Sequence, residues 1–170
     1  MKNKGKIFES QFKKSAQKEG LFVHRIRDNA MSYTQSESIY THKNMCDFLI
    51  YKMPFLYAFE LKHTTYPSIG IQTSPDEDEK MIQYEQIRQL NEASQYEGIK
   101  AGFVLSFENT KAETESTFFI EVSRFIDFLT ETKKKSINML DIARYGGVRL
   151  KQNKIKVNYH YEITDLLSRI

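Results

Sequence analysis

The alternation of apolar and polar residues predicts an α/β chain in which helices and strands take turns. Apolar residues recur at helical spacing within residues 5–18, and Gly20 stands where that helix would end. Short apolar runs predict strands over 21–23, 48–51, 55–61, 101–107 and 117–122. Further helices are expected over 80–96 and 124–130. This order predicts a mixed sheet. The expected buried face of the first helix comprises Phe8, Phe12, Ser15 and Ala16.

The segments between these elements are polar and irregular. Residues 26–45 have little periodicity, which predicts a long loop or a mobile arm and hints at function. Residues 64–78 form a second expected loop, which leads into an acidic cluster at 76–79. The basic residues from 133 onward look less regular, with a turn at Gly146-Gly147. Because no linker or repeat divides the chain, we expect one domain over 1–170, with an arm at 26–45 and a basic C-terminal part at 133–170.

Composition narrows the class of protein. Of the 170 residues, 40% are apolar, which suffices for a packed core. No apolar run is long enough to predict a transmembrane helix, and the basic N-terminus lacks the apolar stretch of a secretory signal. The single cysteine, Cys46, excludes an intramolecular disulfide and a Cys-rich zinc module. We therefore expect a cytoplasmic protein with no membrane partner.

The net charge of +3 hides a segregated pattern. Residues 1–27 carry +6, residues 28–132 carry −9, and residues 133–156 carry +7. Two basic ends around an acidic middle suit a protein whose ends bind a polyanionic backbone and whose middle holds cations. Alternatively, these charge runs are simply solvated faces.

The stretch from Asp47 to Lys62 carries the most informative chemistry. Its charged residues stand among apolar and aromatic neighbours, and Lys52-Met53-Pro54 divides it into the two arms of a β-hairpin. Because side chains alternate across a strand, Glu60 and Lys62 point to the same face, and the hairpin turn brings Asp47 back beside Glu60. Two carboxylates at close quarters repel each other unless a cation lies between them.

A divalent cation with oxygen ligands resolves this repulsion. Mg²⁺ is the natural candidate, since it binds through one or two carboxylates, keeps several waters and contacts phosphate oxygens. The pattern favours phosphodiester hydrolysis, in which Lys62 orients or helps deprotonate the attacking water and stabilises the phosphorane charge. Alternatively, Glu60 and Lys62 form a buried salt bridge and Asp47 only ends the hairpin. A Glu-x-Lys triplet alone is weak evidence, because Glu131-Thr132-Lys133 also fits it in a polar setting, where we expect surface charge.

The spacing of Asp47, Glu60 and Lys62 resembles the PD-(D/E)xK nuclease superfamily. Within it, the chain is similar to the RecU-like Holliday junction resolvases of bacteria and their phages. The similarity is thin in identity but runs in order over most of the chain. It implies a restriction-endonuclease-like core, in which helices flank a central mixed β-sheet. The segments that carry it, besides the motif, are 5–9, 85–87, 103–107, 117–120, 135–137 and 146–148.

The resemblance implies roles for individual residues. Asp47 and Glu60 would ligate Mg²⁺, for which Mn²⁺ could substitute, and Lys62 would stabilise the transition state. Gln86 would bind the metal directly or through a water, and Glu9 would complete the acidic set. Alternatively, Glu9 is a first-turn acid that favours the helix N-terminus, and Gln86 is a solvated helix position.

Two departures from the family pattern concern the region before Asp47. Met45 stands where the family often has a threonine ligand, and methionine is a poor ligand for Mg²⁺. Residues 26–45 are also shorter than the stalk that the family inserts before its aspartate. The first departure concerns the metal coordination at that position, where Asn44 could substitute, and the second concerns the mode of junction recognition rather than the nuclease chemistry.

Basic residues at both ends of the chain are candidates for binding branched DNA. A four-way junction presents phosphates on several arms, and it is defined by shape rather than by base sequence. Tyr33 and Tyr40 could stack on unpaired bases or could be ordinary loop tyrosines. The resemblance implies a homodimer, since symmetrical cutting of two strands needs two sites. The candidate DNA-binding residues are Lys4, Lys6, Lys13, Lys14, Arg25, Arg27, Lys133, Lys134, Lys135, Arg144, Arg149 and Lys151.

The sequence thus predicts an Mg²⁺-dependent, structure-selective DNA endonuclease that cleaves Holliday junctions in recombination and repair. Two other functions remain open. One is a restriction or repair nuclease of the same superfamily, and the other is a DNA-binding module without catalysis.

Overall fold

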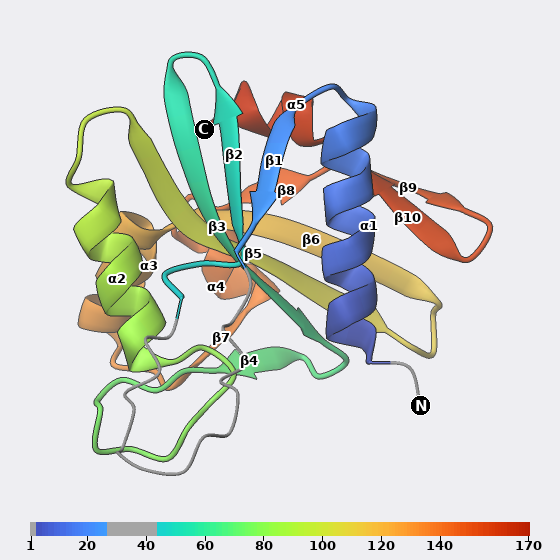
Figure 1. The fold of residues 1–170 in the computed structure, drawn as a ribbon. Coiled ribbons are helices and arrows are strands. Elements are labelled where there is room, and N and C mark those ends of the chain that lie inside the picture. The colour runs from blue at the N-terminus through green and yellow to red at the C-terminus, as the bar shows by residue number, and fades with distance from the viewer. Residues whose placement is uncertain (1–2, 27–43) are drawn as a thin grey trace, which may run out of the picture.

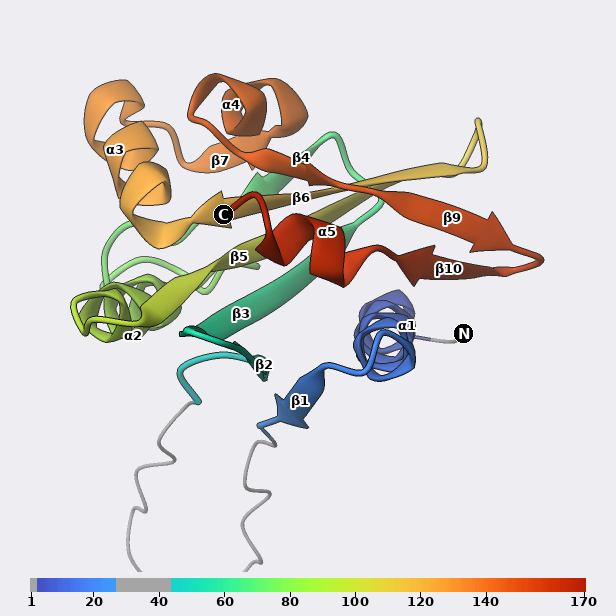
Figure 2. The ribbon, with the colours of Figure 1, turned by 90° about the horizontal axis from the view of Figure 1, so that it is seen from above.

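The computed structural model describes residues 3–26 and 44–170. A six-stranded mixed sheet lies at its centre, with helices on both faces (Figures 1 and 2). The helices are α1 (Lys4–Lys18), α2 (Tyr84–Ser94), α3 (Val122–Thr132), α4 (Met139–Arg144) and α5 (Ile163–Leu167). The strands are β1 (Phe22–Arg25), β2 (Phe48–Lys52), β3 (Phe55–Thr64), β4 (Ser68–Gly70), β5 (Ile99–Asn109), β6 (Thr114–Glu121), β7 (Ser136–Asn138), β8 (Val148–Leu150), β9 (Gln152–Ile155) and β10 (Asn158–Tyr161).

The order of strands in the main sheet is β1-β2-β3-β5-β6-β8. β3 and β5 pair in parallel, whereas β2 with β3 and β5 with β6 pair antiparallel. Two small sheets, β4 with β7 and β9 with β10, lie beside it. The predicted α/β class, with a central mixed sheet flanked by helices, is therefore confirmed. No helix in the described part of the chain is long and apolar enough to cross a membrane.

Two hydrophobic cores, one on each face, hold the sheet between its helices. On one face α1 buries Phe8 and Phe12 against Phe48 and Phe59, and α5 completes this aromatic core. On the other face lie α2, α3 and α4. Burying each phenylalanine contributes about 2–3 kcal/mol. The buried residues of α1 are those that its periodicity predicts: Phe8, Phe12, Ser15 and Ala16.

The prediction of a helix over 80–96 is wrong at its start, because α2 begins at Tyr84. Gln83 and Gln86 form a reciprocal capping box that fixes the helix N-terminus there. The preceding residue, Ile82, is extended instead, since its backbone N–H donates to the Gly70 carbonyl at 3.1 Å. Met81, expected on the buried face, is exposed.

Short strands and helices within segments predicted to be irregular are a second correction. β4 lies within the predicted loop 64–78, and β7, α4, β8, β9, β10 and α5 occupy the C-terminal part that looked less regular. These elements are three to six residues long, too short to show a hydrophobic period. The turn at Gly146 is as predicted, with a φ of +79° that favours glycine. The predicted arm over 26–45, with Arg27, Tyr33 and Tyr40, falls almost entirely on residues 27–43, outside the described residues.

Candidate active site

The β2–β3 hairpin places Asp47 beside Glu60. Phe48 pairs with Phe59 in the antiparallel ladder, so the next position along each strand sets the two acids opposite each other. The Asp47 backbone N–H donates to the Phe59 carbonyl at 3.1 Å. The Leu61 N–H donates to Asp47 Oδ2 at 2.7 Å. The aspartate is therefore fixed by backbone groups of the strand that carries Glu60.

Lys62 lies on the same face of β3 as Glu60. Its Nζ is 2.8 Å from Glu60 Oε1, and the glutamate side chain is only 4% exposed. Neighbouring Leu61 points into the core beneath α1, as alternation along a strand requires. The buried ion pair is thus present, and Asp47 is part of the same group of charges rather than a separate hairpin end.

Gln86 joins this group from the first turn of α2. Its Nε2 donates to Glu60 Oε1 at 2.5 Å, and its Oε1 accepts from the Gln83 backbone N–H at 3.1 Å. The amide oxygen is therefore engaged at the helix N-cap, and the amide nitrogen faces the carboxylate. In this arrangement Gln86 orients Glu60, and its predicted contact with a metal stays a prediction.

The site is poor in compensating positive charge. Burial raises the pKa of Glu60 to about 7; the charge of Asp47 adds to this effect, while Lys62 opposes it. Burial likewise raises the pKa of Asp47, although the Leu61 N–H favours its ionised form. Cys46, 1% exposed, is a buried small residue as predicted. Burial, aided by Glu60 and Asp47, raises the pKa of its thiol to about 12, so it remains neutral.

The donor set fits a hard divalent cation held by two carboxylates. Asp47 and Glu60 are both harder to ionise than free carboxyls, and a cation beside them would offset that cost. Within residues 3–26 and 44–170, no three His, Cys, Asp or Glu side chains form a ready metal cluster. Mg²⁺ needs only one or two protein carboxylates, because water and substrate phosphate complete its shell.

Glu9 lies on the other side of the sheet, on α1, and its carboxylate pairs with Arg25 of β1. Its charge still contributes to the raised pKa of Asp47 and of Glu60. Glu9 is thus close enough to raise the pKa of the two site carboxyls, although its own carboxylate forms an ion pair with Arg25. Arg25, expected to reach a DNA phosphate, is the partner that holds it.

A polar cluster that the sequence did not predict lies under α1, on the face of the sheet opposite Lys62. His63 Nε2 lies 3.3 Å from Glu108 Oε2 and 3.8 Å from Glu115 Oε2. Lys4 Nζ is 2.8 Å from Glu108 Oε1, and the Tyr161 hydroxyl donates to Glu115 at 2.6 Å. Alternation along β3 places His63 on this face, but its partners come from β5 and β6, which local pattern does not reveal.

The structure separates the two basic ends of the chain. α1, with Lys6, Lys13 and Lys14, covers one face of the sheet, whereas the loop after α3 lies toward the other (Figure 2). Several candidates are already neutralised by acids. Besides Arg25 with Glu9, the pairs within 4 Å are Lys4 with Glu108, Lys134 with Asp141, Lys135 with Glu77, and Lys151 with Asp165. Arg149 instead donates to the Ser116 hydroxyl at 3.5 Å.

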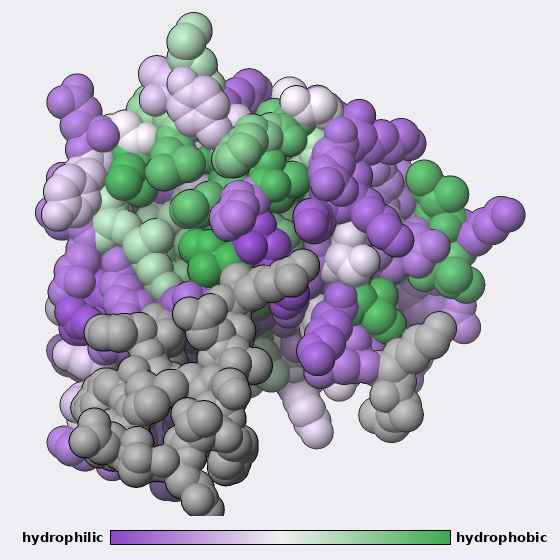
Figure 3. Space-filling view, in the orientation of Figure 1, coloured by the Kyte–Doolittle hydropathy of each residue, from purple (hydrophilic) through white to green (hydrophobic). Residues whose placement is uncertain are grey.

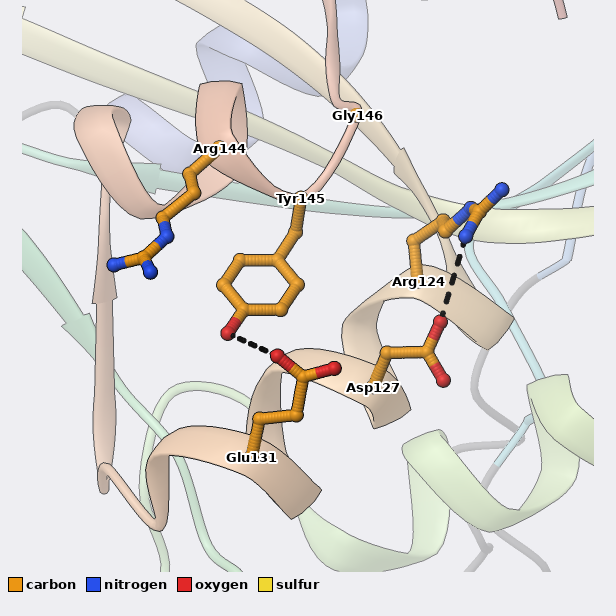
Figure 4. A pocket seen from close by; sticks show the side chains of 6 residues that line it. All are labelled: Arg124, Asp127, Glu131, Arg144, Tyr145 and Gly146. Carbon is orange, nitrogen blue, oxygen red and sulfur yellow. Dashed lines mark hydrogen bonds and ion pairs between the residues drawn. The ribbon is translucent and has the colours of Figure 1, made fainter.

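Arg144 borders an open cavity of about 510 Å³ between α3 and α4 (Figure 4). The acids in this cavity are engaged elsewhere: Glu131 accepts from the Tyr145 hydroxyl at 2.8 Å, and Asp127 lies 3.7 Å from Arg124. The Arg144 guanidinium points away from both. Glu131 and Lys133, the second Glu-x-Lys pair, are exposed, as predicted for surface charge.

Comparison with known proteins places the chain in a family. No family model matches it. The SPbeta prophage-derived uncharacterized protein YotM of Bacillus subtilis (strain 168) is 32% identical over 180 residues, which cover 99% of this chain and 87% of YotM. The chain therefore belongs to the YotM family. Among solved structures, Archaeoglobus fulgidus Hjc, a Holliday junction resolvase from an archaeal hyperthermophile, is similar at a TM-score of 0.49. That match has 16% identity and covers 82% of this chain and 94% of Hjc.

Proposed function

We propose that the chain is a divalent-metal-dependent DNA endonuclease of the PD-(D/E)xK superfamily, with a restriction-endonuclease-like core, and that its substrate is the four-way junction. The observation that carries the proposal is the grouping of Asp47, Glu60 and Lys62 on the β2–β3 hairpin, with Lys62 Nζ 2.8 Å from Glu60 Oε1. One buried and one half-buried carboxylate beside an amine, fixed by backbone pairing, are a costly arrangement for stability alone.

Asp47 and Glu60 would hold Mg²⁺, for which Mn²⁺ could substitute. When bound, the ion would supply positive charge to the scissile phosphate and lower the pKa of a coordinated water. Lys62 would stand beside the reacting phosphate, orient the attacking water and stabilise negative charge on the phosphoryl oxygens. The attacking water would lose a proton to solvent as its oxygen bonds to phosphorus and the bond to the leaving deoxyribose oxygen breaks; that leaving oxygen would take up a proton from solvent.

The remaining residues would act on geometry and charge. Gln86 would keep Glu60 in position through its 2.5 Å hydrogen bond. Glu9, while paired with Arg25, would contribute negative potential near the metal. Lys6, Lys13 and Lys14 of α1, with the loop residue Lys133, make no ion pair with any described residue and would bind phosphates.

A homodimer would supply the two sites that symmetrical cutting requires. Light scattering of the purified chain, alone and with a junction, measures the oligomeric state directly. A monomer in both conditions would contradict this part of the proposal.

The decisive test compares cleavage of an immobile four-way junction with cleavage of a linear duplex, with Mg²⁺ and with EDTA. We expect metal-dependent cutting of the junction that Asp47→Asn and Glu60→Gln abolish. Glu131→Gln is the matched control, because it removes the acid of the exposed second Glu-x-Lys pair. Equal cutting of both substrates would indicate a less selective nuclease, and binding without any cutting would indicate a DNA-binding module.

A further inference from the structure

A projecting β-hairpin near the C-terminus has no place in the proposed active site. β9 and β10 pair antiparallel, with Ile155 opposite Asn158, so the turn consists of Lys156 and Val157 alone. The hairpin extends outward beyond α1 in both views (Figures 1 and 2). It is thus an arm on the flank of the helix that carries the N-terminal lysines.

Strand β10 is bonded to α1 from Asn158, beside the turn, to Tyr161 at the base of the hairpin, whereas the turn residue Val157 is exposed. Gln11 of α1 donates from Nε2 to Asn158 Oδ1 at 3.1 Å and accepts from the Tyr159 N–H at 3.3 Å. The Tyr161 N–H donates to Ser15 Oγ at 3.0 Å. These bonds hold the arm in a defined direction, which a binding element requires if it is to reach a partner without a large ordering cost.

The tip combines exposed apolar side chains with positive charge. Ile155 is 53% exposed and Val157 82% exposed. Residues 152–161, which form the hairpin, include two lysines, Lys154 and Lys156, and no acid. Lys154 lies 4.0 Å from Glu113, whereas Lys156 makes no ion pair with any residue that the structure describes. Figure 3 shows this outer edge of the molecule as hydrophobic atoms bordered by hydrophilic ones.

The backbone of the two-residue turn is strained, and glycine in place of Lys156 would relieve that strain. Lys156 has a φ of +58°, in the left-handed region that favours glycine in two-residue hairpin turns. A non-glycine residue there costs about 1 kcal/mol or more. The exposed valine beside it adds apolar surface to water. Both unfavourable features are in the two turn residues, which would be the first to contact a binding partner. Local backbone strain of this kind is often found at functional positions.

We propose that the β9–β10 hairpin is a DNA-binding arm that docks into a groove of duplex DNA. Its lysines would contact the phosphates on either side of the groove, and Ile155 and Val157 would pack against sugars and base edges. A two-stranded ribbon fits a DNA groove, and the charge of this segment complements a polyanion. This inference rests on the proposed function, because the hairpin would add a contact with the same DNA, away from the cleavage site.

Crosslinking at the tip tests the arm directly. The chain has one natural cysteine, Cys46, which is buried, so Val157→Cys provides a single accessible thiol for a photoactivatable label. We expect the labelled protein to crosslink to an immobile junction on irradiation. Met53→Cys is the matched control, because Met53 is also 82% exposed in a hairpin turn and lies at the end of the β2–β3 hairpin away from Asp47. Equal crosslinking from both positions, or no crosslinking from residue 157, would overturn the proposal that this hairpin binds DNA.

A salt titration gives a second, independent readout. Lys156→Gln should weaken DNA binding and reduce the slope of log affinity against log salt by about one, as expected for one lost phosphate contact. Lys80→Gln, another exposed lysine in a loop, should leave the slope unchanged. An unchanged slope in Lys156→Gln would overturn the proposal that the hairpin binds DNA. Junction cleavage by the wild type would still support the proposed function. A wild-type chain that binds no DNA overturns both.

Discussion

Replacing Glu60 by glutamine should make the metal-free protein less sensitive to rising pH while abolishing cleavage. The Glu60 side chain is 4% exposed, and burial raises its pKa from 4.5 to about 7. The folded state therefore binds a proton more tightly than the unfolded state does. Its contribution to stability is fully present below pH 4.5 and is lost as the pH rises to about 7.

The size of this effect follows from the same two pKa values. The difference is 2.5, and each pKa unit corresponds to about 1.4 kcal/mol, so wild type should lose about 3 kcal/mol of unfolding free energy across this range relative to Glu60→Gln. The amide oxygen of a glutamine at this position can still accept from Gln86, which keeps the local hydrogen bond. Burial also raises the pKa of Asp47, so in both proteins this residue adds a decrease of unfolding free energy with rising pH.

The assay is urea unfolding of both proteins in EDTA at several pH values from 5 to 8. We expect the two curves of unfolding free energy against pH to diverge progressively up to about pH 7 and to run parallel above it. Adding Mg²⁺ at pH 8 should stabilise wild type, because the ion binds the folded state, but not Glu60→Gln. Parallel curves throughout the range, or equal stabilisation by Mg²⁺, would refute the assignment of Glu60 as a buried, metal-binding carboxyl.

Three further predictions use other parts of the structure. Lys62→Ala should lower the single-turnover cleavage rate by about 10²-fold or more while junction affinity in a gel-shift assay stays near wild type; a matched loss of affinity would make Lys62 a binding residue. Gly102→Ala should destabilise the fold by about 1–3 kcal/mol in thermal unfolding, because a Cβ there would lie 2.3 Å from the Ile120 carbonyl oxygen; a neutral substitution would contradict this packing. Junction binding should fall steeply with salt, and a flat titration by fluorescence anisotropy would argue against phosphate contacts.

The parts of the molecule that could be predicted are those fixed by local pattern. The buried face of α1 follows from 3.6-residue periodicity, and the β2–β3 hairpin follows from two apolar runs around Pro54. The grouping of Glu60 and Lys62 with Asp47 follows from alternation and from the hairpin register. These features depend on residues at most 15 positions apart, so the sequence carries them directly.

The parts that could not be predicted depend on distant contacts. The start of α2 is decided by a capping box and by the bridge between Ile82 and Ile71, which compete with helical periodicity. Arg25 reads as a free cation, yet α1 brings Glu9 to it. The partners of His63 lie on strands more than 40 residues away. The arm formed by β9 and β10 has no long apolar run, since its side chains face solvent along most of its length.

β3 contributes side chains to both hydrophobic cores, so it links packing on one face of the sheet to the proposed site on the other. Its odd-numbered side chains pack beneath α1, and its even-numbered ones carry the carboxylate and amine of the site. A change in the aromatic packing would therefore shift the strand that carries the proposed catalytic side chains. The side chains of Phe12 and Phe59 lie on the opposite side of β3 from the carboxylate and amine of the proposed site. If that site is catalytic, substitutions of these side chains should change the cleavage rate, and sequence variation in the apolar core would be limited by catalysis as well as by folding.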